Sequence, residues 1–147
     1  NRYGFFRCST SFYNRPLKDE DMLSLISSYL IGWENAVGAR IADRDKNLGP
    51  FSKISGFRFM ISMLPAFWEQ AIKEERHLHP DYISGKIKSL FAEAGMEARD
   101  LFDKNSEYIR SSANNPFVSE TSIALLAKEW SGRLKSLTSG NFNPLAM

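Results

Sequence analysis

The chain of 147 residues contains 43% hydrophobic and 24% charged residues and carries a formal net charge of +2. This length and composition are typical of a single globular domain, residues 1–147, that folds without disulfides or metal. The nearly balanced charge disfavours a surface dedicated to nucleic acid or to an anionic membrane, and no apolar run is long enough to span a membrane.

Three further features of the sequence bear on the cellular location, the processing and the core packing of the chain. The single cysteine, Cys8, excludes an internal disulfide and favours a reducing, cytoplasmic location. The chain begins with Asn1 rather than methionine, so we expect a processed form or part of a longer polypeptide. Aromatic residues make up 13% of the chain, which indicates a bulky core or an aromatic contact surface.

Residues 1–16 read NRYGFFRCSTSFYNRP, with aromatic and β-branched residues in two-residue alternation. This pattern favours an extended segment, yet no second convincing strand follows. We favour an arm that lies extended across the helices. The alternative is a strand whose partner lies upstream or in another chain. Cys8 falls on the apolar face, which favours a buried thiol over a reactive one.

The first helix is predicted to begin at Pro16. Carboxylates at positions 19–21 occupy its first turn, where they favour the positive end of the helix dipole. Its apolar stripe consists of Met22, Ile26, Tyr29, Trp33, Val37 and Ile41. Gly32 and Gly38 fall inside this pattern and indicate a close helix crossing. The segment DRDKNLGP, residues 43–50, then breaks the helix.

The central helix, about residues 52–75, is the element around which we expect the others to be arranged, with Ser52 as its N-cap. Two apolar stripes run along it: Ile54, Phe57, Ile61, Leu64, Trp68 and Ile72, and Met60, Met63, Phe67 and Ala71. These stripes leave little polar surface, so burial nearly all round is predicted. Pro65 predicts a kink, or two helices meeting at that point, and Gly56 offers room for a close neighbour.

Three more helices follow in the sequence. Pro80 suits the first turn of one helix, and Gly95 is its expected stop. A second is predicted over roughly 97–111, before the breaker ANNP at 113–116. The last begins after Ser119 as its cap and ends at Gly140. The predicted fold is therefore mainly α: a single-domain bundle of five to six helices around the central helix, with an extended N-terminal arm.

His77 and His79 form an H-x-H pair with Glu74, Glu75 and Asp81 nearby. Imidazole and carboxylate are a usable ligand set for zinc or iron, so a metal-dependent enzyme centred on this pair is one hypothesis. The alternative is that the histidines serve at the ends of the flanking helices. No third ligand is evident from the sequence.

Nucleic-acid binding is a second hypothesis. Arg2, Arg7 and Arg15 alternate with aromatic residues, a combination that suits single strands. Further basic residues lie on predicted helix faces: Lys86, Lys88, Arg133 and Lys135. Residues 122–137 also resemble the first helix and turn of a DNA-binding helix-turn-helix, but the small residue and the turn glycine are separated by five positions rather than four.

A partner-binding surface is the third hypothesis. Met60 and Met63, with Phe67 and Trp68, would make an adaptable apolar groove, and Tyr3, Phe5 and Phe6 of the arm would contact the same partner. The alternative is that the groove residues form the core and that the arm packs on it.

No nucleophile elbow, phosphate loop or dinucleotide fingerprint occurs in the sequence, and no cofactor is predicted. We therefore favour a non-catalytic helical protein-interaction or regulatory module, with another protein or a second copy of the chain as its partner. Nucleic-acid binding and a metal-dependent activity are the alternatives.

Overall fold

The computed structural model describes residues 18–112 and 115–141, with side chains up to residue 137. These residues contain no strand and confirm the mainly α bundle. Their helices are α3 (Asp19–Val37), η1 (Ile41–Asp43), η2 (Lys46–Ser52), α4 (Ile54–Lys73), α5 (Pro80–Glu93), η3 (Ala98–Leu101), α6 (Glu107–Ser111) and α7 (Glu120–Asn141). The predicted arm, residues 1–16, lies outside the described residues.

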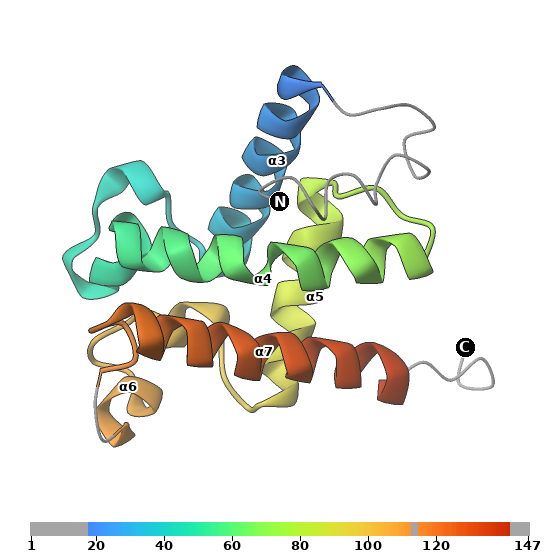
Figure 1. The fold of residues 1–147 in the computed structure, drawn as a ribbon. Helices are drawn as coiled ribbons and strands as arrows, with labels where there is room; N and C mark the ends of the chain where they lie inside the picture. Colours follow the sequence, from blue (N-terminus) through green and yellow to red (C-terminus); the bar gives the residue numbers. More distant parts are fainter. Residues whose placement is uncertain (1–17, 113–114, 142–147) are drawn as a thin grey trace.

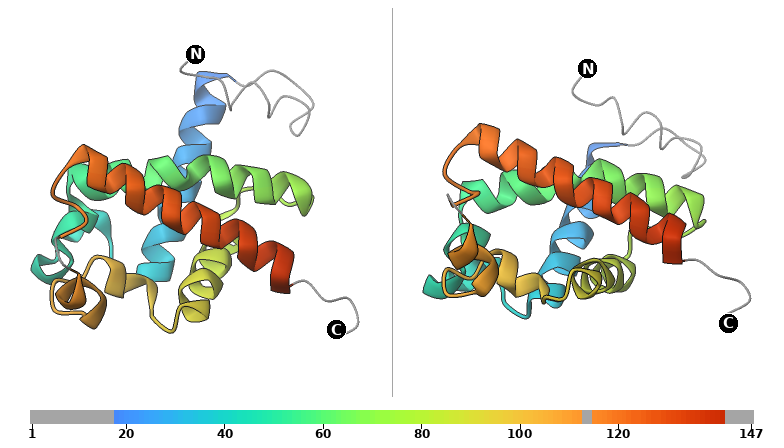
Figure 2. Two further views of the ribbon diagram at one scale, coloured as in Figure 1. Left: turned by 60° about the horizontal axis from the view of Figure 1, so that its bottom comes forward. Right: turned by 90° about the horizontal axis from the view of Figure 1, so that it is seen from below.

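The long helices form two layers. In Figure 1, α4 and α7 lie side by side in front and run in the same direction, while α3 and α5 pass behind them. Figure 2 shows α5 end-on beneath a lengthwise α7, so the two layers cross steeply. The short helices η2, η3 and α6 close the end at which α4 and α7 begin.

Trp33 of α3 joins the two layers through aromatic contacts. Its indole is fully buried and meets four rings edge-on at centroid distances from 5.9 to 6.4 Å: those of Phe59, Phe67, Phe91 and Phe102. Phe102 extends the cluster to Phe51 and Phe117 at 5.1 and 5.6 Å. These residues come from both layers, so much of the aromatic content serves the core.

The described part of α3 begins at Asp19 and ends earlier than the sequence predicts. The Asp21 carboxylate accepts a hydrogen bond from the Lys18 backbone N–H at 2.9 Å. At the other end, Gly38 is left-handed with φ of 79°, and its N–H donates to the Glu34 carbonyl at 2.8 Å. Because glycine adopts this conformation without strain, Gly38 stops the helix rather than lying inside it, and the predicted extension to Ile41 is wrong.

The central helix, α4, is a single helix that passes through Pro65, so the alternative of two helices meeting there is wrong. Ser52 is not its cap, because that hydroxyl donates to the Ile41 carbonyl at 2.6 Å. Ten residues of α4 are buried. Burial nearly all round is nevertheless wrong: Ile54, Phe57 and Ile72 are 70%, 44% and 38% exposed. The reason is that α4 lies in an outer layer and turns one side to solvent.

The single helix predicted over 97–111 is also wrong, since η3 and α6 are separate. Between them, the Asp103 carboxylate accepts from the Asn105 N–H at 2.8 Å, and the Ser106 hydroxyl caps α6 by accepting from the Ile109 N–H at 3.2 Å. Such local side-chain bonds compete with helix continuation. By contrast, Pro80 begins α5 as predicted, and Gly95, with φ of 75°, follows its end.

Two glycines permit close approaches between elements, as the sequence indicates. A Cβ atom at Gly32 would lie 2.5 Å from Ile83 Cγ2 of α5. A Cβ atom at Gly56 would lie 2.0 Å from the Pro50 carbonyl oxygen, which belongs to the backbone of η2. The first contact joins α3 to α5, and the second fixes where α4 starts.

We predict that Gly56→Ala destabilises the fold by about 2 kcal/mol or more, because a backbone carbonyl cannot yield to the added methyl group. Gly85→Ala is the matched control: Gly85 is exposed inside α5, with nothing within 4 Å of an added Cβ. There the substitution should stabilise by up to about 1 kcal/mol. Urea unfolding would measure both, and equal effects would contradict the close approach.

Candidate functional site

The two histidines lie in the connector between α4 and α5. The His79 backbone N–H donates to the His77 carbonyl at 2.8 Å, and His79 precedes Pro80 as the N-cap residue of α5. Glu74, a candidate ligand, pairs with Lys86 instead at 2.7 Å. Within the described ranges, no three His, Cys, Asp or Glu residues are placed to hold a metal ion. The third ligand that the metal hypothesis needs is therefore not supplied by this part of the chain.

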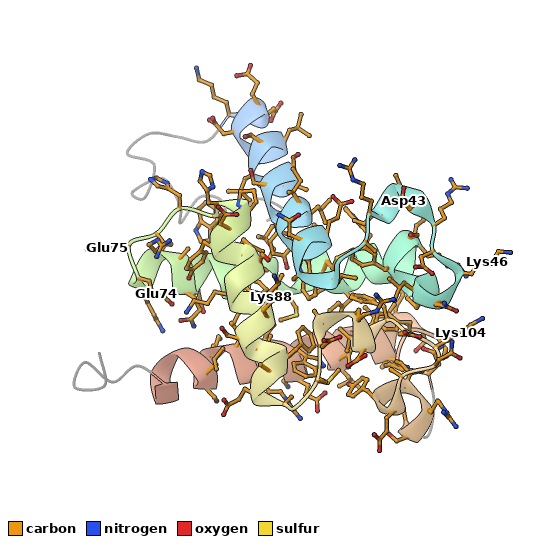
Figure 3. All side chains as sticks on the ribbon, turned by 180° about the vertical axis from the view of Figure 1, so that it is seen from behind. Asp43, Lys46, Glu74, Glu75, Lys88 and Lys104 are labelled. Atoms are coloured by element: carbon orange, nitrogen blue, oxygen red, sulfur yellow. The ribbon has the colours of Figure 1, made fainter. Side chains whose placement is uncertain are left out.

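The predicted basic residues are divided between the two layers. Lys86 pairs with Glu74, and Lys88 is exposed on α5, in the layer that faces the viewer in Figure 3. On α7, Arg133 lies over the Trp130 ring at 4.6 Å and 3.7 Å from Glu129. These side chains do not form a common basic stripe. Arg2, Arg7 and Arg15 lie outside the described residues.

The helix-turn-helix interpretation is wrong, because α7 continues through Gly132 to Asn141. Trp130 and Leu134 are fully buried on either side of this glycine. Their packing holds both turns in one helix and outweighs the cost of a glycine in its interior.

The residues predicted to form a partner groove lie in the core. Met60, Met63 and Phe67 are fully buried, Trp68 is 3% exposed, and the Phe67 ring packs against Tyr29 at 5.6 Å. None of these side chains offers a surface in this structure. Tyr3, Phe5 and Phe6 belong to the arm outside the described residues.

Several large apolar side chains are exposed on α3, on α7 and just before α7, but a line of them lies on the outer side of α4. Ile54, Phe57 and Ile72 are exposed, and Ile61 and Pro65 lie between them on the same side of the helix. A shallow groove of about 310 Å³ runs between α4 and α7 beside this line. It is lined by Phe57, Arg58, Ile61, Ser62, Glu120, Ile123 and Ala124.

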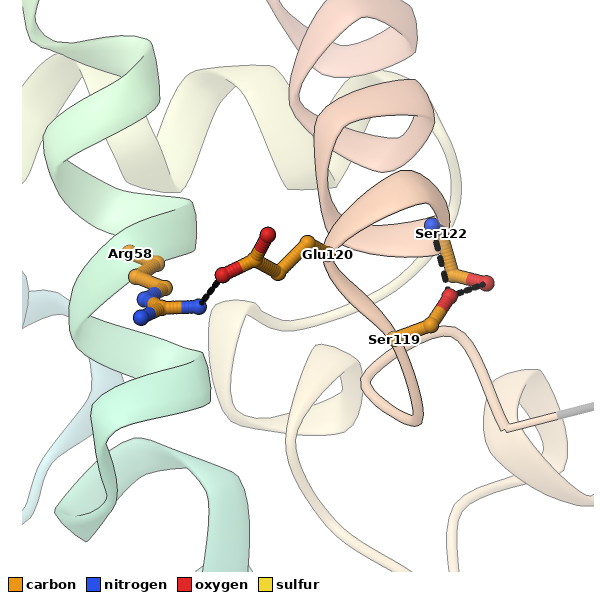
Figure 4. A network of polar contacts seen from close by, with 4 residues as sticks. All are labelled: Arg58, Ser119, Glu120 and Ser122. Atoms are coloured by element: carbon orange, nitrogen blue, oxygen red, sulfur yellow. Dashed lines mark hydrogen bonds and ion pairs between the residues drawn. The ribbon is translucent and has the colours of Figure 1, made fainter.

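Ion pairs cross from α4 to α7 at each end of this surface. Arg58 pairs with Glu120 where the two helices begin, and Ser119 caps α7 there by accepting from the Ser122 N–H at 3.1 Å (Figure 4). Towards the other end, Glu69 pairs with Lys135 at 3.5 Å. All four side chains are at least half exposed. We call these charges and the apolar line beside them the α4–α7 face.

The sequence contains a signal for this face that the spacing of the apolar residues alone does not reveal. Arg58, Ser62, Glu69 and Lys73 recur at helical spacing along α4 and mark a polar line next to Ile54 and Ile72. A helix with such a line turns that side to solvent. Apolar residues adjoining it therefore lie at the surface or at an interface.

Two buried tyrosines and one partly buried tyrosine carry the resolved pKa shifts of the described residues. Burial raises the pKa of Tyr29, whose hydroxyl donates to the Met60 carbonyl at 2.5 Å. Burial, together with the neighbouring Glu74 carboxylate, raises the pKa of Tyr82, whose ring lies between Arg76 at 5.4 Å and Lys86 at 5.7 Å. Burial also raises the pKa of Tyr108. These groups stay protonated at neutral pH and serve packing.

No protein-family model, no curated protein and no solved structure matches this chain. Among the described residues, no helix is both long enough and apolar enough to cross a membrane.

We predict that the free energy of unfolding falls as the pH rises above 10. A tyrosine with a raised pKa in the folded state ionises first in the unfolded chain, so its contribution is complete below pH 10 and is lost above it. Tyr29 and Tyr82, whose pKa values are strongly raised, should each contribute a slope of up to about 1.4 kcal/mol per pH unit.

Urea unfolding between pH 9 and 11 would measure this slope. Tyr29→Phe should reduce this slope by the contribution of one tyrosine, up to about 1.4 kcal/mol per pH unit. Tyr82→Phe should also reduce the slope. Because phenylalanine does not titrate, a Tyr29→Phe slope equal to that of the wild type would contradict burial of this hydroxyl.

Proposed function

We propose that this domain is a non-catalytic protein-interaction module whose docking surface is the α4–α7 face. The observation that carries the proposal is the exposure of Ile54, Phe57 and Ile72 on the helix that also supplies ten buried residues to the core. Contiguous apolar side chains with a polar rim are typical of interaction surfaces. A regulatory role and a cytoplasmic setting belong to the same proposal.

The helices of the face are formed and packed without a partner. The buried side of α4 packs on the aromatic cluster around Trp33, and α7 packs along its flank. A preorganised helix loses little conformational entropy on binding. The exposed residues are therefore positioned to bind without refolding.

The expected affinity is modest. Complete burial of an isoleucine or phenylalanine contributes roughly 1.5–3 kcal/mol, and the exposed residues of this face are already partly covered. Association itself costs an estimated 4 kcal/mol or more. A few such side chains leave a small net free energy of binding, which is typical of a reversible, regulated contact rather than a permanent one.

Selection of peptides from a random phage-displayed library against the full chain would test the proposal. We expect enriched peptides with apolar residues at helical spacing, and we expect Ile54→Asp or Phe57→Asp to weaken their binding at least tenfold. That factor corresponds to about 1.4 kcal/mol, less than one buried apolar side chain contributes.

Leu23→Asp is the matched control, because Leu23 is as exposed as Ile54, at 70%, but lies on α3. It should leave peptide binding unchanged. Failure to enrich any peptide, or binding that ignores both α4 substitutions, would overturn the proposed docking surface.

A further inference from the structure

We propose that the α4–α7 face binds a second copy of this chain, turned end for end so that the two α4 helices pack antiparallel. The inference rests on the proposed function and names the occupant of that surface. Two features of the face carry it: the order of its apolar residues and the order of its charges.

Four of the five residues in the apolar line on α4 are placed symmetrically along the helix. Met63 is its midpoint: Ile54 lies nine residues before it and Ile72 nine residues after it, while Ile61 and Pro65 lie two residues to either side. In an antiparallel pair centred there, Ile54 packs on Ile72 of the second copy, and Ile61 packs on its Pro65. These four side chains thus meet apolar side chains, whereas Phe57 is the exception, because its counterpart in this register is Glu69.

The four rim charges alternate in sign. On α4 the positive Arg58 comes first and the negative Glu69 follows, whereas on α7 the negative Glu120 comes first and the positive Lys135 follows. Turning a second copy end for end places Arg58 opposite the second copy's Glu69. It likewise places Glu120 opposite the second copy's Lys135. Every rim charge meets its opposite, which is the complementarity that fixes register at an interface.

One exposed charge on α7 opposes this arrangement. Lys128 lies near the midpoint between Glu120 and Lys135, so the two copies of its ammonium group approach each other. The long side chain allows both groups to turn towards solvent. The antiparallel arrangement therefore predicts that removing the charge of Lys128 strengthens the dimer.

The area of the face indicates a weak dimer. A helix of this length spans about 30 Å, and two packed helices are about 20 Å wide, so each copy covers about 600 Å². This lies at the low end for specific interfaces, and measurable association needs micromolar or higher protein concentrations.

Sedimentation velocity of the full chain over increasing concentration would test self-association. We expect a monomer–dimer equilibrium that weakens at least tenfold in Ile54→Asp and in Phe57→Asp. It should be unchanged in Leu23→Asp and tighter in Lys128→Gln. A monomer at every concentration, or a dimer unaffected by either α4 substitution, would overturn the second copy as occupant.

A charge exchange would test the register. Arg58→Glu places two carboxylates opposite each other and should weaken the dimer, whereas combining it with Glu69→Arg should restore the dimer. Circular dichroism would confirm that each variant is folded. A double variant as weak as the single one would contradict the antiparallel pairing of these positions.

Disulfide trapping gives an independent check on direction. In a Cys8→Ser background, a mixture of the Ile54→Cys and Ile72→Cys chains should cross-link, and each chain alone should not. Self-cross-linking of Ile54→Cys would instead show parallel packing and overturn the proposal. A chain that stays monomeric yet binds selected peptides through Ile54 and Phe57 would retain the proposed function and lose only the second copy.

Discussion

The packing of Trp33 against rings from both layers is the contact on which the rest of the fold depends. Its neighbour Gly32 lets Ile83 of α5 approach α3, while the indole itself reaches the rings of Phe59 and Phe67 on α4. Two consecutive residues therefore join α3 to a helix in each layer. Because buried aromatic rings remove large apolar areas from water, this one region accounts for much of the driving force that holds the layers together.

The exposed side of α4 follows from this arrangement. The aromatic cluster holds α4 from behind and α7 covers one flank, but a helix in the outer layer of a two-layer bundle keeps a side that no other described element covers. On that side the chain carries Ile54, Phe57 and Ile72 rather than a purely polar sequence. Local sequence that conflicts with the surrounding fold often marks a functional surface, which is why we assign the docking surface there.

Much of the fold was predictable because local chemistry decides it. Pro80 begins α5, Gly95 follows its end, and Ser119 caps α7. These effects involve only the turns in which the residues lie. The break between η3 and α6 was missed because the hydrogen bonds of Asp103 and Ser106 compete with an apolar pattern that continues on both sides. Periodicity alone does not weigh these two effects.

The candidate site was less predictable, since both stripes of α4 are equally apolar in the sequence. The polar line of α4 indicates which side faces solvent, but packing decides that Phe67 contributes to the core while Phe57 lies at the surface. The same holds for the basic residues: the sequence shows Lys86 and Lys135, but not that Lys86 lies beside Glu74, which follows α4, or that Lys135 lies beside Glu69 of α4. A site made of surface pairs depends on tertiary neighbours, and these do not appear in a one-dimensional pattern.

The rim ion pairs also determine what kind of association the face supports. Within one chain, Arg58 already pairs with Glu120, and Glu69 with Lys135. A second copy exchanges these pairs for equivalent ones and adds none, and exposed pairs contribute little energy in either arrangement. In the proposed dimer the charges therefore select orientation, whereas affinity comes from the apolar line beside them. The core of the described residues is complete without that line, which is why we propose a reversible association rather than an obligate one.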